Sequence, residues 1–351
     1  MADFGVLDPD RLQVVLLGPG FGESVLVRVP GAAPGWLVVD SLLSDRGGKA
    51  RSAVLSALRD LATEPDLVLL THAHADHAGG MDILVERFRD RAAFGMLDLD
   101  FGTVASAKVR AAAQGQEVAA ALRAIRQVPK DRRWDLGSGP VPLGDGSVTV
   151  LHPSEERLRQ LIRMSSVGPN RFSSAVLIDW GERSVLLGAD LERPEWVSLV
   201  EAPRLSLGNP IKVPHHGSPG AFDKTWVGDT ATTPENASRR SLVAPFDKHP
   251  KLPDLDDDES IPGLLGEFTQ VDLTSLPFKT TPTATGQWKL QDLRDARDAG
   301  IEENPPLPGG FRPLTSAQVE PNEDDAWVLA ELSADGACDV RGGAASLNLT
   351  A

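Results

Sequence analysis

Cysteine is almost absent from this chain of 351 residues, since Cys338 is the only one. A single cysteine excludes an intrachain disulfide and also excludes zinc modules built from several thiolates. A reducing compartment fits this composition, and we expect a cytoplasmic protein.

Long hydrophobic runs are also missing. The N-terminal stretch MADFGVLDPDRLQVVLLGPG has no basic segment before its short apolar run. No stretch elsewhere approaches the roughly 18 apolar residues of a membrane span. We therefore expect a soluble chain with no standard export signal and no membrane partner.

Positive charge is in short supply, with 35 Lys and Arg against 50 Asp and Glu and a net charge of −15. Such a chain repels a nucleic-acid backbone unless a local patch or a bound metal offsets the charge, which excludes strong non-specific binding of duplex DNA. Basic residues do gather in and after an Ala-rich stretch, where they could line a substrate or form a solvated helix face, the commoner outcome. They are Lys108, Arg110, Arg123, Arg126, Lys130, Arg132 and Arg133.

Histidine is scarce too, yet three of the seven histidines lie in LTHAHADHAGG, from Leu70 to Gly80. This stretch follows the strand-like run PDLVLL and precedes the helix-like run GGMDILVERFRDR, so it occupies the carboxyl end of a strand, where α/β proteins place their sites. In an extended segment His72 and His74 point to one side and can chelate one ion, while Asp76 and His77 face a second position. The spacing predicts a metal site.

The rest of the chain has a mixed α/β pattern. Before the histidines we expect strands at LQVVLLG, SVLVRVP and GWLVVD, and a helix at GKARSAVLSALRDLA. After them we expect an Ala-rich helical insertion near 103–130, then strands at SVTVLHP, SSAVLIDW, RSVLLGAD, IKVPHHGS and SLVAPFDKHP. Residues 1–275 form the expected main domain, and 276–325, with one helical piece at KLQDLRDARDA, are interpreted mainly as linker. Residues 326–351 predict a closing β-hairpin packed on that domain.

The HAHADH stretch resembles the HxHxDH signature of the metallo-β-lactamase superfamily. LLGAD, ending at Asp190, looks like that family's metal-bridging aspartate, and KVPHHGS resembles its last histidine motif. Within the superfamily, GPGFGES, NRFSSAVLID and PHHGS are most similar to the hydrolase domain of ComEC-type competence proteins and their stand-alone relatives. The resemblance implies a four-layer αββα sandwich that holds one or two divalent ions, Zn or Mn.

The resemblance implies a specific ligand set and one departure from it. Many members have a histidine four residues before the serine of a HTPGS-like turn, whereas this chain has Asn170 before Ser174. Asparagine offers a neutral oxygen, so the first metal site should be weaker or suit a harder ion such as Mn²⁺. ComEC-like proteins share this asparagine, so it does not by itself imply a dead enzyme. The expected ligands are His72, His74, Asp76, His77, Asn170, Asp190 and His216.

Other polar residues are expected around these ligands. His215 neighbours His216 and is expected to support it, although the sequence does not decide which of the two binds the ion directly. Asp40 is a candidate to accept the second N–H of a metal-bound imidazole. Glu23 stands where ComEC-like proteins often have Asp, and an ordinary turn residue is its alternative. His249 resembles a ComEC-like histidine that could bind substrate or carry a proton, although a surface turn would look the same.

The function implied is hydrolysis by metal-activated water, with Asp76 or Asp190 orienting the nucleophile. No cysteine lies near the motif and the chain has no GxSxG elbow, so a covalent nucleophile is not evident. The resemblance favours a phosphodiester substrate in nucleic acid or a nucleotide. Two alternatives stay open: hydrolysis of an ester, thioester or lactam, and a metal-stabilised sensor or partner-binding module with little turnover.

Overall fold

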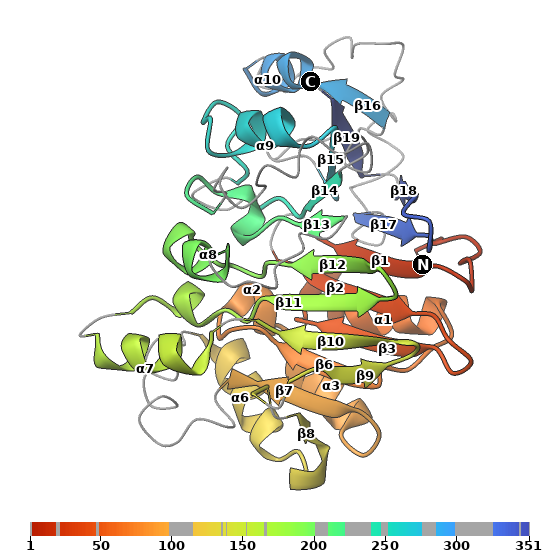
Figure 1. Cartoon of the computed structure of the whole chain (residues 1–351), viewed down its shortest axis with the longest axis vertical. Helices are drawn as coiled ribbons and strands as arrows, with labels where there is room; N and C mark the ends of the chain where they lie inside the picture. The colour runs from red at the N-terminus through yellow and green to blue at the C-terminus, as the bar shows by residue number, and fades with distance from the viewer. Residues whose placement is uncertain are drawn as a thin grey trace.

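Two mixed β-sheets pack face to face, and helices cover their outer faces (Figure 1). Within the described residues, no helix combines the length and the apolar character needed to cross a bilayer. The computed structural model describes residues 2–18, 22–46, 49–97, 115–134, 136–137, 139–151, 153–164, 167–200, 210–221, 240–246, 252–275, 286–298, 326–343 and 345–350.

The first sheet has the strand order β18-β17-β1-β2-β3-β6-β7-β8. Strands β3, β6, β7 and β8 are parallel, and the remaining neighbours are antiparallel. Its strands are β1 (Leu12–Leu17), β2 (Ser24–Val29), β3 (Gly35–Val39), β6 (Leu67–Leu70), β7 (Ala93–Met96), β8 (Arg133–Trp134), β17 (Trp327–Leu332) and β18 (Cys338–Gly342).

The second sheet has the order β16-β19-β15-β14-β13-β12-β11-β10-β9, with β12 to β15 parallel. Its strands are β9 (Val141–Leu143), β10 (Gly146–Val150), β11 (Val176–Trp180), β12 (Arg183–Leu187), β13 (Ile211–Lys212), β14 (Arg240–Val243), β15 (Gln270–Leu273), β16 (Gly286–Lys289) and β19 (Leu347–Thr350). A separate small hairpin pairs β4 (Leu43–Arg46) with β5 (Lys49–Ser52).

The helices form the outer layers. The α-helices are α1 (Ala53–Asp60), α2 (Ala75–Ala78), α3 (Met81–Phe88), α6 (Gln116–Arg126), α7 (Glu155–Arg163), α8 (Arg193–Val200), α9 (Ile261–Glu267) and α10 (Leu290–Asp298). Three 3-10 turns, η1 (Lys130–Arg132), η2 (Pro169–Phe172) and η3 (His215–Gly217), lie between them.

Alternation along each strand divides the core into layers. In β1, Val14 and Leu16 face the apolar layer between the two sheets, whereas Val15 and Leu17 face the helices, because successive side chains of a strand point to opposite faces. A third apolar cluster lies between the second sheet and α8, α9 and α10. The predicted αββα sandwich is therefore confirmed.

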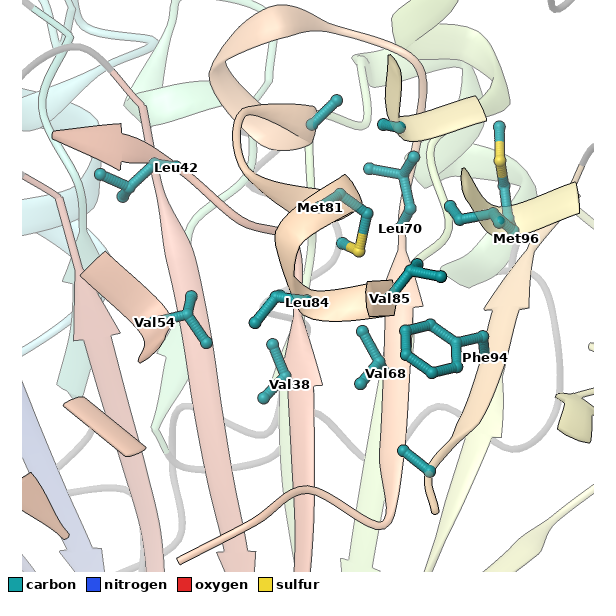
Figure 2. Close-up of a cluster of buried hydrophobic side chains, with 14 of the residues drawn as sticks. Val38, Leu42, Val54, Val68, Leu70, Met81, Leu84, Val85, Phe94 and Met96 are labelled. Carbon is teal, nitrogen blue, oxygen red and sulfur yellow. The ribbon is translucent and has the colours of Figure 1, made fainter. Parts of the chain in front are cut away.

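The helix α3, which follows the histidine-rich loop, is fixed to the first sheet by its apolar face. Figure 2 shows Met81, Leu84 and Val85 of α3 against Val38 of β3 and Val68 of β6, and all five side chains are buried. Burying one such side chain stabilises the fold by about 1.5–3 kcal/mol, so this contact holds the loop before α3 in place.

The observed elements confirm most of the predicted ones and correct two. The helix expected at 48–62 begins only at Ala53, because Lys49–Ser52 pair as β5 and Ser52, in an extended conformation, caps the helix by accepting from the Leu55 N–H. Within 276–325, interpreted as mainly linker, Gly286–Lys289 form strand β16, while the helical piece there is confirmed as α10. Residues 103–114 of the Ala-rich insertion expected near 103–130, like 276–285 and 299–325, lie outside the described residues.

Candidate metal centre

The polar residues singled out in the sequence lie where strands of both sheets end. Asp40 follows β3 and the histidine-rich loop follows β6, both in the first sheet. Asp190 follows β12, and His215 and His216 follow β13, both in the second sheet. Strand β3 runs parallel to β6 and β12 runs parallel to β13, so their carboxyl ends bring the residues of both sheets to one edge of the sandwich.

The side chains form three groups of metal-ligand type: Glu23, Asp40 and His77 make one, and the other two groups share one residue. Asp190 belongs to both of these two groups, because its carboxylate lies between them. Within each group the ligand atoms lie within 4.8 Å of one another, and the two groups that share Asp190 are Asp76, His77, Asp190 and His216, and His72, His74 and Asp190. The sequence predicted that Asp76 and His77 face a second ion position. Both residues lie on α2, a single helical turn, and their side chains belong to the first of these groups.

Hydrogen bonds fix which ring nitrogen each histidine presents. Nδ1 of His77 donates to Oδ2 of Asp40 at 2.7 Å, and Nδ1 of His216 donates to the carbonyl of Ala244 at 2.8 Å. The Thr71 hydroxyl donates to Oδ2 of Asp40 at 2.7 Å, so it accepts from Nδ1 of His72 at 3.0 Å. In all three histidines Nε2 therefore carries the lone pair and faces the cluster.

Asp40 is the anchor of this arrangement. Its φ of 60° is in the left-handed region, which aspartate tolerates better than most residues. In addition to the two bonds above, its Oδ1 accepts the Thr71 N–H at 2.7 Å, and its carbonyl accepts the Ser24 hydroxyl at 2.8 Å. The Asp40 carboxylate thus holds both Thr71, the first residue of the histidine-rich loop after β6, and His77.

The buried carboxylates and the buried polar atoms without hydrogen bonds at this centre fit divalent cations. The carboxyl-bearing residues Glu23, Asp40 and Asp190 are each at most 2% exposed, and the buried cation that contacts this group is Lys212. Nε2 of His77, Oδ1 of Asp190 and the side-chain oxygen of Asn170 are buried and make no hydrogen bond. Buried polar atoms and charges without partners are costly, and a metal ion satisfies both needs. The residues present therefore fit one or two divalent ions.

The pKa values reflect the crowding of these charges. Burial alone lowers the pKa of His77, but Asp190, Asp40 and Asp76 outweigh it and raise this pKa well above 6.5. Burial lowers the pKa of His72 and of His74 below that value. Burial would raise the pKa of Asp190, yet the adjacent histidine charges hold it well below 3.8. Binding of an ion at Nε2 of His77 therefore competes with a proton on the same atom.

Asn170 lies on η2 and contacts His215, whose Nε2 lies 4.0 Å from Oδ2 of Asp190. Its side-chain nitrogen lies 3.2 Å from Nε2 of His215, whose Nδ1 lies 3.0 Å from the Ser218 hydroxyl. The next residue, Arg171, donates through Nε to Oε1 of the fully buried Glu195 at 2.8 Å, and Nη2 of Arg157 donates to the same oxygen at 2.6 Å. This buried network ties η2 to α8 and α7, and so fixes Asn170 at the site.

A cavity of about 1030 Å³ opens over the two groups that share Asp190. Phe246 stacks on the His216 ring with 5.1 Å between centroids, and Leu252 and Pro residues continue this apolar wall. Polar lining comes from His74, Asp76, Asp190, Glu192, Arg193, His215, Ser218 and Asp254. Such a mixed, concave lining is typical of a small-molecule site.

The structure thus brings together His72, His74, Asp76, His77, Asp190 and His216, with Asn170, His215, Asp40 and Glu23 around them. His216 joins the group with Asp76, while His215 faces Asn170. His249 lies outside the described residues. Sequence reasoning missed Thr71 and Lys212. The signal for Lys212 was a lysine inside the otherwise apolar run IKVP.

Several solved structures are similar to part of this chain. A comparison with curated proteins found no significant match. Among solved structures, a mutant of CmlA beta-hydroxylase is 18% identical over 60% of this chain and 36% of its own, with a TM-score of 0.37. The metallo-beta-lactamase fold protein YhfI from Bacillus subtilis is 17% identical over 57% of this chain and 70% of its own, with a TM-score of 0.34. The metallo-beta-lactamase GOB-18 from Elizabethkingia meningoseptica is 11% identical over 56% and 73%, with a TM-score of 0.32.

The family assignment rests on the sequence itself. The chain spans little more than a third of the CmlA chain, so that protein's activity is not transferred to it. The model of the metallo-beta-lactamase superfamily matches residues 17–255, a range that contains the histidine-rich loop, Asp190 and His216. Members of this superfamily are mostly metal-dependent hydrolases. The chain belongs to the metallo-beta-lactamase superfamily.

Proposed function

We propose that this chain is a metal-dependent hydrolase that cleaves a phosphodiester bond in a nucleotide or nucleic acid. The observation that carries the proposal is the position of Asp190, whose carboxylate belongs to two groups of ligand atoms. A shared carboxylate supports a pair of ions held close together, and paired ions stabilise both the attacking and the leaving oxygen of a phosphodiester.

The residues that would hold these ions fall into the two ligand groups that share Asp190. His72, His74 and Asp190 would hold one ion, with the Asn170 amide oxygen as a weak neutral ligand. The second ion would be held by Asp76, His77, Asp190 and His216. When bound, divalent ions in such a site lower the pKa of water toward about 7 and polarise the bond under attack.

The chain's own residues supply positioning. Oδ2 of Asp76 is 3.3 Å from Nε2 of His216 and its side chain is 18% exposed toward the cavity, so it can orient the nucleophile. His215 is 26% exposed; its two ring nitrogens contact the Ser218 hydroxyl and the Asn170 amide nitrogen, so it can hold the Asn170 side chain in place. The apolar wall of Phe246 and Leu252 offers a surface for a base or another flat group.

The phosphodiester class has two further supports. NRFSSAVLID and PHHGS resemble the hydrolase domain of ComEC-type proteins, and both stretches lie at the centre, around Asn170 and His216. The cavity volume of about 1030 Å³ suits a nucleotide-sized portion of a substrate. The acidic chain favours a small or single-stranded substrate over duplex DNA.

The test is a turnover screen of protein reconstituted with Zn²⁺ or Mn²⁺. Substrates are bis-p-nitrophenyl phosphate, single-stranded DNA, RNA, cyclic dinucleotides and a chromogenic lactam, and Asp190→Asn is the matched control. We expect hydrolysis of at least one phosphodiester by the parent and its loss in the control. Turnover of the lactam alone would replace the phosphodiester by an amide substrate, and two bound ions without any turnover would favour a binding module.

A further inference from the structure

A lysine lies buried beneath the metal centre. Lys212, on β13 of the second sheet, is 1% exposed, although lysine is almost never fully buried without a partner. Its Nζ contacts Oε1 of Glu23, and it donates to the carbonyl of Ala189 at 3.0 Å. Both partners belong to segments that carry candidate ligands.

The Ala189 carbonyl connects Lys212 to Asp190. Ala189 precedes Asp190 and has a φ of 46°, a left-handed conformation that alanine rarely adopts. Such a residue keeps this conformation only where its surroundings hold it. Its carbonyl accepts from Lys212 and from the His215 N–H at 2.8 Å, so these two donors fix the peptide that aims the Asp190 side chain.

The Glu23 segment connects Lys212 to Asp76. The Glu23 N–H donates to the Asp76 carbonyl at 3.1 Å, and a Cβ on Gly22 would lie 2.7 Å from that same oxygen, so this approach requires glycine. Oε2 of Glu23 lies 3.5 Å from Nδ1 of His216. The Glu23 segment, from the first sheet, therefore contacts the α2 turn and the ring that faces it.

We propose that Lys212 and Glu23 are positioning residues that set the distance between Asp76 and Asp190, and hence the spacing of the two ion positions. The path runs from the Asp76 carbonyl through Glu23 and Lys212 to the Ala189 carbonyl and Asp190. This path joins the two sheets at the place where Asp76, after a strand of the first sheet, and Asp190, after a strand of the second, present their carboxylates. The inference rests on the proposed function for its role in catalysis, but the spacing it sets is a property of the metal-binding chain itself.

The experiment measures metal affinity in folded protein. Lys212→Met removes the charge and both hydrogen bonds while keeping the length of the side chain, and the double variant Glu23→Gln with Lys212→Met also removes the unpaired buried carboxylate. Affinity for Zn²⁺ is measured by competition with a chelator, and stability by urea unfolding. We expect both variants to bind the more weakly held Zn²⁺ at least about tenfold less tightly, the usual size of effect for residues that support ligands.

The double variant separates positioning from stability. It should regain most of the stability that Lys212→Met loses, because no unpaired charge stays buried, yet its weak Zn²⁺ binding should persist. If Lys212→Met does not fold, the Zn²⁺ affinity of the double variant tests the proposal. The methionine side chain introduced at position 212 would fill the space between residue 23 and Ala189, so the glutamine amide cannot take over the lost bond.

A matched control comes from a second buried pair in the same sheet. Arg240, at the start of β14 and so at the far end from the centre, lies 3.4 Å from the buried Asp272. Arg240→Met should lower stability and leave Zn²⁺ affinity unchanged. Parent-like Zn²⁺ affinity in the double variant, or equal weakening in Arg240→Met, would overturn the inference. Absence of phosphodiesterase activity in the parent would overturn the proposed function alone, because the Zn²⁺ comparison does not depend on turnover.

Discussion

Oδ1 of Asp190 lies 3.2 Å from Nε2 of His77, and neither buried atom makes a hydrogen bond. Asp190 follows a strand of the second sheet, whereas His77 lies on α2 beside the first sheet. The two ligand atoms thus come from opposite halves of the chain and face each other at the distance of an ion pair. A cation placed between the halves would coordinate both, which makes metal binding and the docking of the two sheets one event.

Asp190 and Asp76 should differ in their effect on metal content. Asp190→Asn weakens ligands of both groups and should remove at least one ion per chain, whereas Asp76→Asn should keep part of its metal because an amide oxygen still coordinates weakly. Turnover of Asp76→Asn should nevertheless fall by a hundred- to several-thousand-fold, a barrier increase of about 3–5 kcal/mol. Elemental analysis and a phosphodiesterase assay measure the two effects. Glu155→Gln, exposed on α7 and not among the residues that line the cavity, is the control. Parent-like turnover in Asp76→Asn would rule out its catalytic role.

Asn170 should set the metal preference of the group containing His72 and His74. Its side-chain oxygen is buried without a partner, and an imidazole in its place restores a nitrogen ligand. We expect Asn170→His to raise affinity for Zn²⁺ relative to Mn²⁺ by about tenfold or more, measured by titration with each ion. Asn170→Ala, which removes the neutral oxygen ligand, should weaken binding of both ions and of Mn²⁺ more than of Zn²⁺. An unchanged preference in Asn170→His would place Asn170 outside the ligands.

The raised pKa of Asp272 should make the free energy of unfolding decrease as the pH rises. Burial raises its pKa to about 6, despite Arg240 nearby and the Asn348 amide that donates to Oδ1 at 2.5 Å. Because the folded chain holds this proton more tightly than the unfolded chain, the stabilisation is full below about pH 4 and is lost as pH rises through about 6. Between pH 5 and pH 7 the parent should lose about 1 kcal/mol more than Asp272→Asn. Urea unfolding at each pH gives this difference, and the exposed Asp258→Asn should behave like the parent. Parallel pH profiles for parent and Asp272→Asn would contradict the raised pKa.

Cys338 should be protected from alkylation until the first sheet opens. The residue lies on β18, and burial raises its pKa to about 12, which leaves little reactive thiolate at neutral pH. Iodoacetamide at pH 8 should label the native chain at least about 1,000-fold more slowly than the chain in urea. Because Cys338 is the only cysteine, labelling of Cys338→Ala should be nil. Native labelling as fast as in urea would mean that β18 is not held on β17.

The types of ligand residue and much of the local structure follow from the amino-acid sequence alone. The short apolar runs LQVVLL and LVLL indicate buried strands and the apolar face of MDILVERF indicates a helix, because these local patterns decide which side chains can be buried together. The spacing of His72, His74, Asp76 and His77 is a local property of one short loop, so it could be recognised without any tertiary contact.

The ligands that complete the metal site around that loop come from the packing of the two sheets. Asp190 and His216 lie more than a hundred residues away in the chain, and the parallel pairing of β12 and β13 in the second sheet brings them to the loop. The strand at 286–289 was not predicted because the four residues GQWK are too short a pattern to indicate a strand, which forms by backbone pairing with β19. Lys212 was missed for the same physical reason: its burial depends on Glu23 and the Ala189 carbonyl, partners that only the packing of the two sheets places within reach.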